Sequence, residues 1–474
     1  MKLQSSMLRL EAAPAFLSDL VDTLTERGRS LLFGRGDRPD ADGKRDLVSL
    51  AEALLSRRGE ASGVVLAQAL LARFKEADTD TRCRFLLALA DRLGPDPAAV
   101  EAAIDAYRTA PGSDTLSRLH TVAEPRRQEL FRRLNLAPRG TAALVAMREA
   151  LLEELDTHPE LATVDADFVH LFSSWFNRGF LVLRKIDWTT PANILEKIIR
   201  YEAVHAIEDW NDLRSRLEPA DRHCYGFFHP QLVDEPLIFV EIALTREPPD
   251  AIGPLLDLTR QPIDPTEATT AVFYSISNTQ KGLAGVSFGH FLIKQVVEEL
   301  KREVPSLKTF VTLSPVPGFA RWLEKAKDEP DYGLDAETRA ALARLPAAGE
   351  PVAPELREAL RPALSAAAAH YFLKAKGRNG RALDPVARFH LGNGARLERL
   401  NLWGDGSQKG LKQSHGLMVN YLYDLDRIEA NHEAYAERGE IAAASAIRKL
   451  IRTETTKPKP QDTATLPAPA RVAD

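Results

Sequence analysis

The sequence predicts a multidomain protein, with an all-helical N-terminal domain and a C-terminal α/β domain that contains a mixed sheet. Residues 15–188 carry apolar side chains at three- and four-residue steps, the period of a helix buried on one face. From about residue 220, runs such as "PLIFVEIALT" are rich in the β-branched and aromatic residues that favour strands. A strand, a glycine turn, a helix and another strand then follow in order, which is typical of an α/β unit.

The helical domain is expected over residues 15–188, after a flexible N-terminus at 1–14. Leu86, Leu89 and Leu93 illustrate its apolar spacing. One helix has a recognisable start, because Asp96 is a good N-cap and Pro97 suits the first helical position. No residue pattern in this domain indicates a catalytic site, so we expect the domain to pack against the rest of the chain or to form oligomers.

The α/β domain is expected over residues 189–452, followed by a disordered tail at 453–474. Four stretches read as strands: "HCYGFFHP", "PLIFVEIALT", "TTAVFYSIS" and "LKTFVTLSPV". A helix is expected over 286–303, and residues 328–380 are mostly helical in pattern. The segment "DPVARFHLGNGARLERLNLWGDGS" reads as a turn followed by a strand. The segment "SHGLMVNYLYDL" fits a strand or a helix equally well.

Composition excludes several classes of function. The chain has 474 residues, a net charge of -5 and 27% charged residues, so a general nucleic-acid-binding role is not expected. Its two cysteines, Cys83 and Cys224, have no metal-ligand spacing and form no disulfide framework. No signal peptide and no apolar run long enough for a membrane span is found. These features predict a cytoplasmic protein that binds neither metal nor membrane.

The stretch "SISNTQKGLAGVSFGHF" at residues 275–291 joins a predicted strand to a predicted helix through glycines. Glycines let backbone N–H groups approach an anion, and a helix N-terminus adds partial positive charge. The stretch matches neither the dinucleotide fingerprint nor the P-loop pattern. Two interpretations therefore stay open from the residues alone, an anion-binding loop and a plain tight turn.

The frame of this stretch resembles the acyl-CoA loop of the acetyltransferase fold, R/Q-x-x-G-x-G/A, with Thr279 at the first position. Several separated motifs together resemble the malonyl-CoA decarboxylase family. They are "SISNTQKGLAGVSFGHFLIKQVV", "LSPVPGF", "DPVARFHLGNGA" and "SHGLMVNYLYDL". Asp384 stands where many relatives would carry Asn. The resemblance implies a C-terminal acetyltransferase-like domain behind the helical one.

The resemblance also implies an activity, the decarboxylation of malonyl-CoA to acetyl-CoA and CO₂ through a thioester enolate. Ser314 and His390 would be the catalytic pair. His390 would bind the thioester carbonyl or supply the proton, and Ser314 would orient the carboxylate or share the proton transfer. Tyr423 would donate to the substrate or orient His390. Taken without the family, Ser314 reads as a turn residue, His390 as a structural histidine and Tyr423 as a core tyrosine.

By the same resemblance, one loop is expected to bind the CoA part of the substrate. Its residues are Thr279, Gln280, Lys281, Gly282, Leu283, Ala284 and Gly285. No cofactor is needed, because CoA belongs to the substrate. Malonyl-CoA is the expected partner, and a homo-oligomer, dimer or tetramer, is expected. The Ser-Lys-Leu ending of some relatives, a peroxisomal address, is not at the end of this sequence.

Two rival functions fit the same residues. An acetyltransferase on the same scaffold would bind acetyl-CoA and need a nucleophilic acceptor. A non-catalytic CoA-binding or interaction protein would hold CoA and release no CO₂. Turnover of malonyl-CoA without an acceptor separates both from a decarboxylase.

Overall fold

The structure is a computed structural model that describes residues 46–56, 59–286, 292–377 and 380–451. The expectations for residues 1–14 and 453–474 lie outside these ranges, as does the start of the helix expected over 286–303. The chain divides into two compact units. Unit 1 comprises the chain through Arg246 and residues Gln261–Lys308, and unit 2 comprises Glu247–Arg260 and the chain from Thr309 onward.

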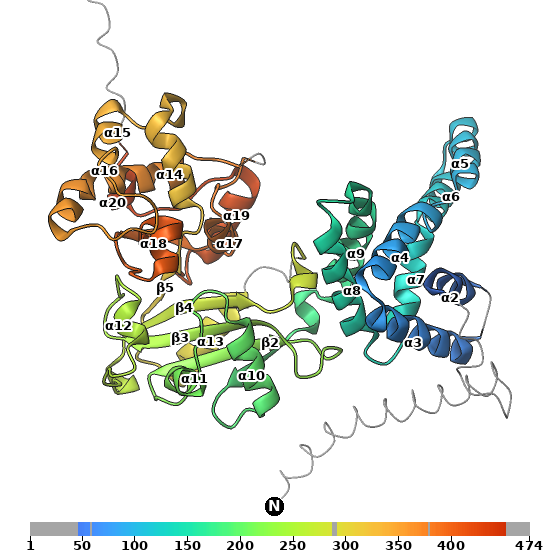
Figure 1. The fold of residues 1–474 in the computed structure, drawn as a ribbon, viewed down its shortest axis with the longest axis horizontal. Coiled ribbons are helices and arrows are strands. Elements are labelled where there is room, and N and C mark those ends of the chain that lie inside the picture. The colour runs from blue at the N-terminus through green and yellow to red at the C-terminus, as the bar shows by residue number, and fades with distance from the viewer. Residues whose placement is uncertain (1–45, 57–58, 287–291, 378–379, 452–474) are drawn as a thin grey trace, which may run out of the picture. The chain divides into compact units, whose positions relative to one another are not determined.

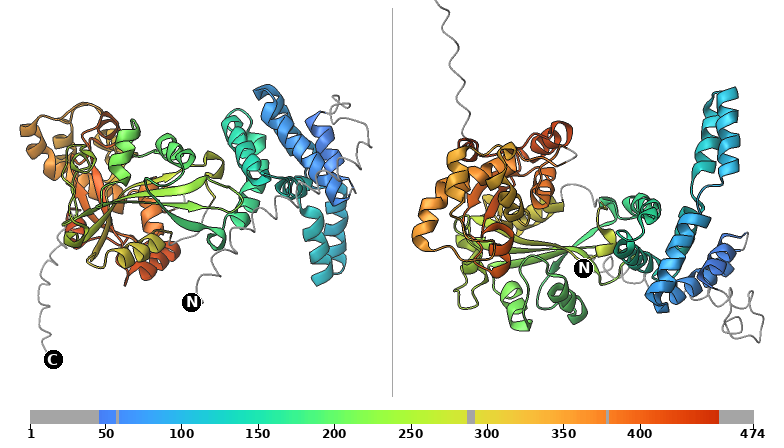
Figure 2. Two further views of the ribbon diagram at one scale, coloured as in Figure 1. Left: turned by 90° about the horizontal axis from the view of Figure 1, so that it is seen from below. Right: turned by 45° about the horizontal axis from the view of Figure 1, so that its top comes forward.

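The first part of unit 1 is helical, as the sequence predicted (Figure 1). Its core contains Phe131 stacked on Phe168, with ring centroids 4.1 Å apart. Asp96 caps the helix that Pro97 begins, accepting a hydrogen bond of 3.0 Å from the backbone N–H of Ala98. The helices are α2 (Leu47–Leu55), α3 (Glu60–Glu76), α4 (Thr79–Arg92), α5 (Pro97–Thr109), α6 (Ser113–Ala123), α7 (Arg126–Asn135), α8 (Gly140–Glu154) and α9 (Ala162–Trp175). Figure 2 shows α5 and α6 side by side as a hairpin.

The second part of unit 1 is an antiparallel arrangement of strands in the order β1-β2-β3-β4. Every residue of β2 is buried, and so is every residue of β3 except the last, as expected of the run "PLIFVEIALT". Apolar side chains of α10 and α11, including Ile198 and Leu213, share one core with Phe239 of β3. The elements are β1 (Val182–Ile186), α10 (Ala192–Tyr201), α11 (Trp210–Leu217), β2 (Arg222–Phe228), β3 (Pro236–Thr245), β4 (Thr270–Asn278) and α13 (Leu292–Glu303).

Unit 2 is built around strand β8, which pairs antiparallel with β5, β6 and β7. The strands are β5 (Thr309–Thr312), β6 (Ser314–Pro315), β7 (Arg396–Asn401) and β8 (Met418–Leu422). The helices are α12 (Gly253–Leu256), α14 (Phe319–Asp328), α15 (Ala336–Leu342), α16 (Pro354–Leu373), α17 (Pro385–Gly392), α18 (Gln408–Ser414), α19 (Ile428–Arg438) and α20 (Ser445–Arg448). The segment "SHGLMVNYLYDL", which fitted a strand or a helix equally well, contains strand β8.

One local expectation is wrong. The beginning of "DPVARFHLGNGARLERLNLWGDGS" was expected to be a turn, but it forms α17, and β7 follows as expected. Asp384 caps α17 by accepting a 2.9 Å hydrogen bond from the backbone N–H of Ala387, and Pro385 occupies the first turn. This is the same start signal that was recognised at Asp96 and Pro97.

The predicted fold class is confirmed: a helical region precedes an α/β region with a mixed sheet. The domain boundary at 188/189 stays a prediction. Within the described ranges, no helix combines the length and the apolar character that a bilayer crossing requires.

Candidate active site

Ser314, His390 and Tyr423 lie together in unit 2 as one hydrogen-bonded chain. Oγ of Ser314 lies 3.0 Å from Nε2 of His390, and Nδ1 of His390 lies 2.8 Å from the hydroxyl of Tyr423. All three side chains are buried, with Ser314 5% and His390 3% exposed. The structure therefore brings together the three residues that the resemblance singled out.

Three elements hold these side chains in place. Ser314 begins β6 and is opposite Val419 of β8, so strand pairing fixes its backbone. His390 lies in the last turn of α17. Tyr423 directly follows β8, and its backbone N–H donates a 2.9 Å hydrogen bond to the carbonyl of Phe310. The site therefore rests on a sheet and the end of a helix rather than on long loops.

Thr312 extends the chain by one hydroxyl, and the sequence analysis did not identify it. Its Oγ1 accepts hydrogen bonds from the hydroxyl of Ser314, at 2.8 Å, and from the backbone N–H of Tyr421, at 3.1 Å. Asn420 supports the same strand by donating a 2.8 Å hydrogen bond to the carbonyl of Thr312. Thr312 is two residues from Ser314, which is the spacing of one strand face and was the available signal.

The directions of these hydrogen bonds assign the protons. Because the Ser314 hydroxyl donates to Thr312, Oγ of Ser314 accepts the Nε2–H of His390. Nδ1 of His390 then accepts the Tyr423 hydroxyl proton. One neutral tautomer of the imidazole satisfies every partner in the chain.

The burial of the site keeps its groups neutral. Burial lowers the pKa of His390 from 6.5 to about 3, and burial raises the pKa of Tyr423 well above its ordinary value. The His390 ring also stacks on Tyr421, with ring centroids 4.5 Å apart. The site is thus an uncharged chain of hydrogen-bonded side chains at neutral pH.

Asp384, where the resemblance expects Asn, has a structural role in this site. Besides capping α17, its second carboxylate oxygen accepts a 3.2 Å hydrogen bond from the hydroxyl of Tyr371. Burial raises the pKa of this carboxyl group. Asn and Asp are both good N-caps, so the departure from the family pattern leaves the position of His390 intact.

The glycine loop lies in unit 1, where it packs against helix α8 of the helical region. A Cβ atom on Gly282 would lie 2.0 Å from the backbone carbonyl oxygen of Val145. The guanidinium of Arg148 donates 2.8 Å hydrogen bonds to the carbonyls of Gly282 and Ala284. Close packing on α8 is therefore one physical reason for glycine at position 282.

The backbone donors of this loop are partly engaged within the loop itself. The N–H groups of Leu283 and Ala284 donate to the carbonyls of Gln280 and Lys281, at 3.0 and 2.9 Å. Thr279 is buried and its hydroxyl donates to the carbonyl of Pro236. Lys281 is exposed, with its Nζ 3.7 Å from a carboxylate oxygen of Glu149.

A cavity of about 750 Å³ lies in unit 2, next to the segments that carry Ser314 and His390. Gly318 and Pro385 are among its lining residues. Four cationic side chains line it, Arg321, Lys325, Lys374 and Lys376, and the aromatic rings of Trp322, Tyr332 and Tyr371 line it as well. Asp331 is the carboxylate among the lining residues. The sequence analysis did not identify this cluster, because its cations come from α14 and from the segment after α16.

Comparison with known proteins gives consistent matches along the chain. The model of the malonyl-CoA decarboxylase C-terminal domain matches residues 179–461, and that of the malonyl-CoA decarboxylase N-terminal domain matches residues 93–176. The mitochondrial malonyl-CoA decarboxylase of Mus musculus is 37% identical over 363 residues, which is 70% of this chain and 73% of the relative.

Solved structures give the same result. The malonyl-CoA decarboxylase from Rhodopseudomonas palustris is 65% identical with a TM-score of 0.82, and the match covers 85% of this chain and 98% of that one. The malonyl-CoA decarboxylase from Agrobacterium vitis is 57% identical with a TM-score of 0.81, covering 86% of this chain and 100% of that one. The family models, the curated relatives and the solved structures agree, and the chain belongs to the malonyl-CoA decarboxylase family of carboxy-lyases.

Proposed function

We propose that the protein converts malonyl-CoA to acetyl-CoA and CO₂, and that Ser314 and His390 carry the reaction. The observation that supports this proposal is the buried Ser314–His390–Tyr423 chain in a member of this family. A relay of this kind supplies what the reaction demands, a donor near a developing enolate and a path for one proton.

The proposed step is balanced in atoms and electrons. The bond between the α-carbon and the carboxylate breaks, CO₂ leaves, and the electron pair remains on the thioester as an enolate. One proton from Ser314 then adds to the α-carbon, and a proton from water returns to the Ser314–His390–Tyr423 chain. No metal or organic cofactor enters this proposal, because the thioester itself accepts the electron pair.

The geometry favours a division of roles between the two residues. Both ring nitrogens of His390 are engaged, one with Ser314 and the other with Tyr423. His390 therefore acts on the substrate through Ser314. We assign Ser314 as the residue that contacts the malonyl group and donates the proton, with His390 as the group behind it that orients Ser314 and restores its proton.

The experiment is acceptor-free turnover of malonyl-CoA by the full-length protein, with acetyl-CoA and CO₂ both measured. Ser314→Ala and His390→Ala are run beside the wild type, with His120→Ala, an exposed residue of α6, as the control. We expect release of both products, lost in the two site variants and kept in the control. Bound CoA without CO₂ release would contradict the proposal and favour a binding protein, and turnover only with an acceptor would favour a transferase.

We also propose that the cavity in unit 2 holds the phosphates and the adenine of CoA. None of its four cations forms an ion pair with a described carboxylate. Burial, and then the charge of Lys374, lower the pKa of Lys376, so a bound anion would relieve a repulsion that is already present. The aromatic rings supply a surface on which a purine stacks.

The cavity and the loop of residues 279–285, which the resemblance implies, are alternative locations for the CoA phosphates. We expect the double variant Lys374→Ala/Lys376→Ala to raise the KM for malonyl-CoA about tenfold, equivalent to about 1.4 kcal/mol, with little change in kcat. Lys281→Ala serves as the matched lysine variant in the loop. A larger KM effect from Lys281→Ala than from the double variant would place the phosphates in the loop instead.

Two remaining expectations are proposals of a simpler kind. We expect the chain to form a homo-oligomer. Light scattering should then give a mass in solution of twice the chain mass for a dimer, or four times for a tetramer. A monomeric mass at micromolar concentration would contradict it. A cytoplasmic location predicts that the protein fractionates with cytosolic markers.

A further inference from the structure

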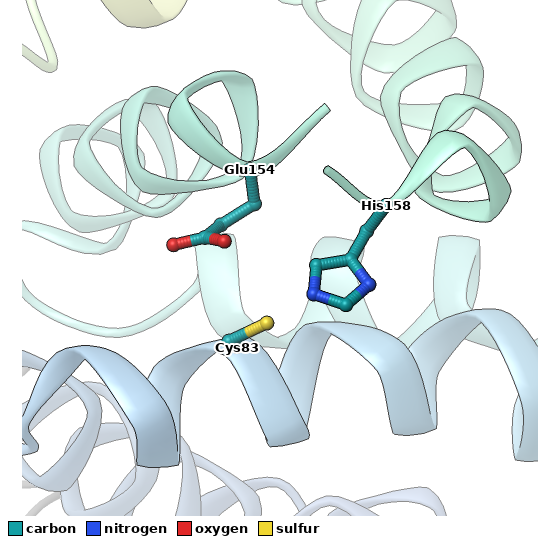
Figure 3. A group of neighbouring side chains, drawn as sticks. All are labelled: Cys83, Glu154 and His158. Atoms are coloured by element: carbon teal, nitrogen blue, oxygen red, sulfur yellow. The ribbon is translucent and has the colours of Figure 1, made fainter. Parts of the chain in front are cut away.

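Three side chains with metal-binding atoms converge in the helical region, outside the site described above (Figure 3). Cys83 comes from α4, Glu154 is the last residue of α8, and His158 lies just before the short helix η3 (Pro159–Leu161). One ligand atom from each lies within 4.8 Å of the other two. Thiolate, carboxylate and imidazole together are a set of donors that zinc accepts.

The backbone around these residues is fixed. The carbonyl of Glu154 accepts hydrogen bonds from the N–H groups of Thr157 and His158, at 3.1 and 2.8 Å. The carbonyl of His158 in turn accepts a 3.1 Å hydrogen bond from the N–H of Leu161. The turn that carries His158 is therefore tied to the end of α8, which carries Glu154.

His158 has the orientation of a metal ligand. Its Nδ1 lies 3.4 Å from a carboxylate oxygen of Glu160. Its other ring nitrogen is turned toward Cys83 and Glu154 (Figure 3). A histidine that binds a metal commonly donates its second N–H to a carboxylate, which fixes the ring and strengthens the ligand.

The electrostatic surroundings favour a cation. The negative charges of Glu154, Asp80 and Glu160 all act on the Cys83 thiol. Three carboxylates thus act on one thiol. A divalent cation would compensate this negative charge and would allow the thiol to lose its proton on binding.

We propose that Cys83, Glu154 and His158 bind one zinc ion, with water as the fourth ligand. Sulfur and nitrogen ligands select zinc over magnesium and calcium, which prefer oxygen ligands. Bond lengths of about 2.0–2.3 Å require the donor atoms to approach to roughly 3.3–3.8 Å. The three side chains are partly exposed, so they have room to make this movement.

The site would link α4 to the connection between α8 and α9. Zinc bound there stabilises the folded helical region, because metal that binds only the folded state adds its binding free energy to stability. The proposed decarboxylation uses none of these three residues. Loss of the metal therefore lowers thermal stability and leaves malonyl-CoA turnover at moderate temperature unchanged.

The test is titration of metal-free, full-length protein with Zn²⁺ by calorimetry and with Co²⁺ as a spectroscopic probe. We expect one equivalent of Zn²⁺, a higher Tm, and a thiolate-to-cobalt charge-transfer band. Cys83→Ser and His158→Ala remove the band. Glu160 is exposed and lies beside Nδ1 of His158, so Glu160→Gln is expected to weaken zinc binding by about 10-fold to 100-fold. A circular-dichroism spectrum of each variant checks that it is folded.

Matched controls make the assignment specific. Glu153→Gln changes the exposed neighbour of Glu154, and Cys224→Ala removes the other cysteine of the chain. Both are expected to bind Zn²⁺ like the wild type. The proposal is overturned if the wild type shows no charge-transfer band and no rise in Tm with Zn²⁺. It is equally overturned if folded Cys83→Ser retains wild-type affinity and the band.

Discussion

At the scale of single residues, the imidazole of His390 is held between two hydroxyl groups in a buried environment. Ser314 accepts from one ring nitrogen and Tyr423 donates to the other. Each contact fixes the tautomer that the other requires. The ring therefore needs no charge to stay in position, and the acidity of the site is set by its burial.

Removal of the Tyr423 hydroxyl tests the outer end of the relay. In Tyr423→Phe, Nδ1 of His390 loses its donor while the aromatic ring stays in the core. We expect a loss of about 1 kcal/mol in the free energy of unfolding and a fall in kcat with little change in KM. Steady-state kinetics and urea unfolding measure the two effects. An unchanged kcat would remove Tyr423 from the relay.

The lowered pKa of His390 predicts how the stability of the protein depends on pH. The unfolded state takes up the imidazole proton near pH 6.5, whereas the folded state takes it up near pH 3. The contribution of the neutral imidazole is thus complete above pH 6.5 and is lost as the pH falls toward 3. His390→Gln should flatten this dependence by up to about 1.4 kcal/mol per pH unit. Urea unfolding of both proteins between pH 4 and pH 8 gives the comparison, and parallel curves would contradict the assignment.

Some residues of the site were predicted from the sequence and one was not. Ser314, His390 and Tyr423 were predicted by family resemblance, but their contacts join positions 76 and 33 residues apart in the chain. No local pattern encodes such contacts. Thr312 was missed because a threonine inside a strand is ordinary for that strand, and only the fold places its hydroxyl on Ser314.

At the scale of elements, strand β3 was predicted from the sequence, whereas helix α17 and the packing of the glycine loop were not. The long buried strand β3 was readable because its apolar run is continuous. Helix α17 was read as a turn, because it has only 8 residues and glycines follow it closely. The glycine loop was interpreted as an anion site, and its packing on α8 became visible only in three dimensions.

Substitution of Gly282 tests that packing. In Gly282→Ala the new Cβ meets the Val145 carbonyl, a backbone atom that no rotamer change can move. We expect a loss of about 1–3 kcal/mol in the free energy of unfolding, measured by urea denaturation. Gly59→Ala, where nothing lies within 4 Å, is the control and should change stability little. Equal stability of both variants would show that α8 does not restrict this position. If a bulkier residue at 282 raises KM more than it lowers kcat, that result supports CoA binding at the loop of residues 279–285 rather than in the cavity.

At the scale of the whole molecule, the helical region is part of unit 1 rather than an independent appendage. Arg148 of α8 also pairs with Asp165 of α9 at 2.8 Å, so the residue that holds the glycine loop is itself held by the helical core. The sequence predicted the two regions, because apolar spacing typical of helices is followed by runs of β-branched and aromatic residues. It could not predict this joint, because a buried arginine that binds carbonyls has no sequence signature.

Deletion of residues 1–176 tests the joint. The remaining chain loses Arg148 and Val145, which leaves the carbonyls of Gly282 and Ala284 without these partners and uncovers the loop. We expect a lower Tm or aggregation, followed by differential scanning fluorimetry and size-exclusion chromatography. A soluble fragment with the Tm and activity of the full-length protein would contradict the expected dependence.

The division into two units also determines how the chain responds to a protease and in what order it folds. The chain passes from one unit to the other three times, at 246/247, 260/261 and 308/309. During synthesis, residues 247–260 must wait for the segment after 308 before unit 2 can close. A single cut at any of these passages divides at least one of the two units between the two fragments. Such a nicked protein stays assembled without a covalent link and separates into fragments only when it unfolds.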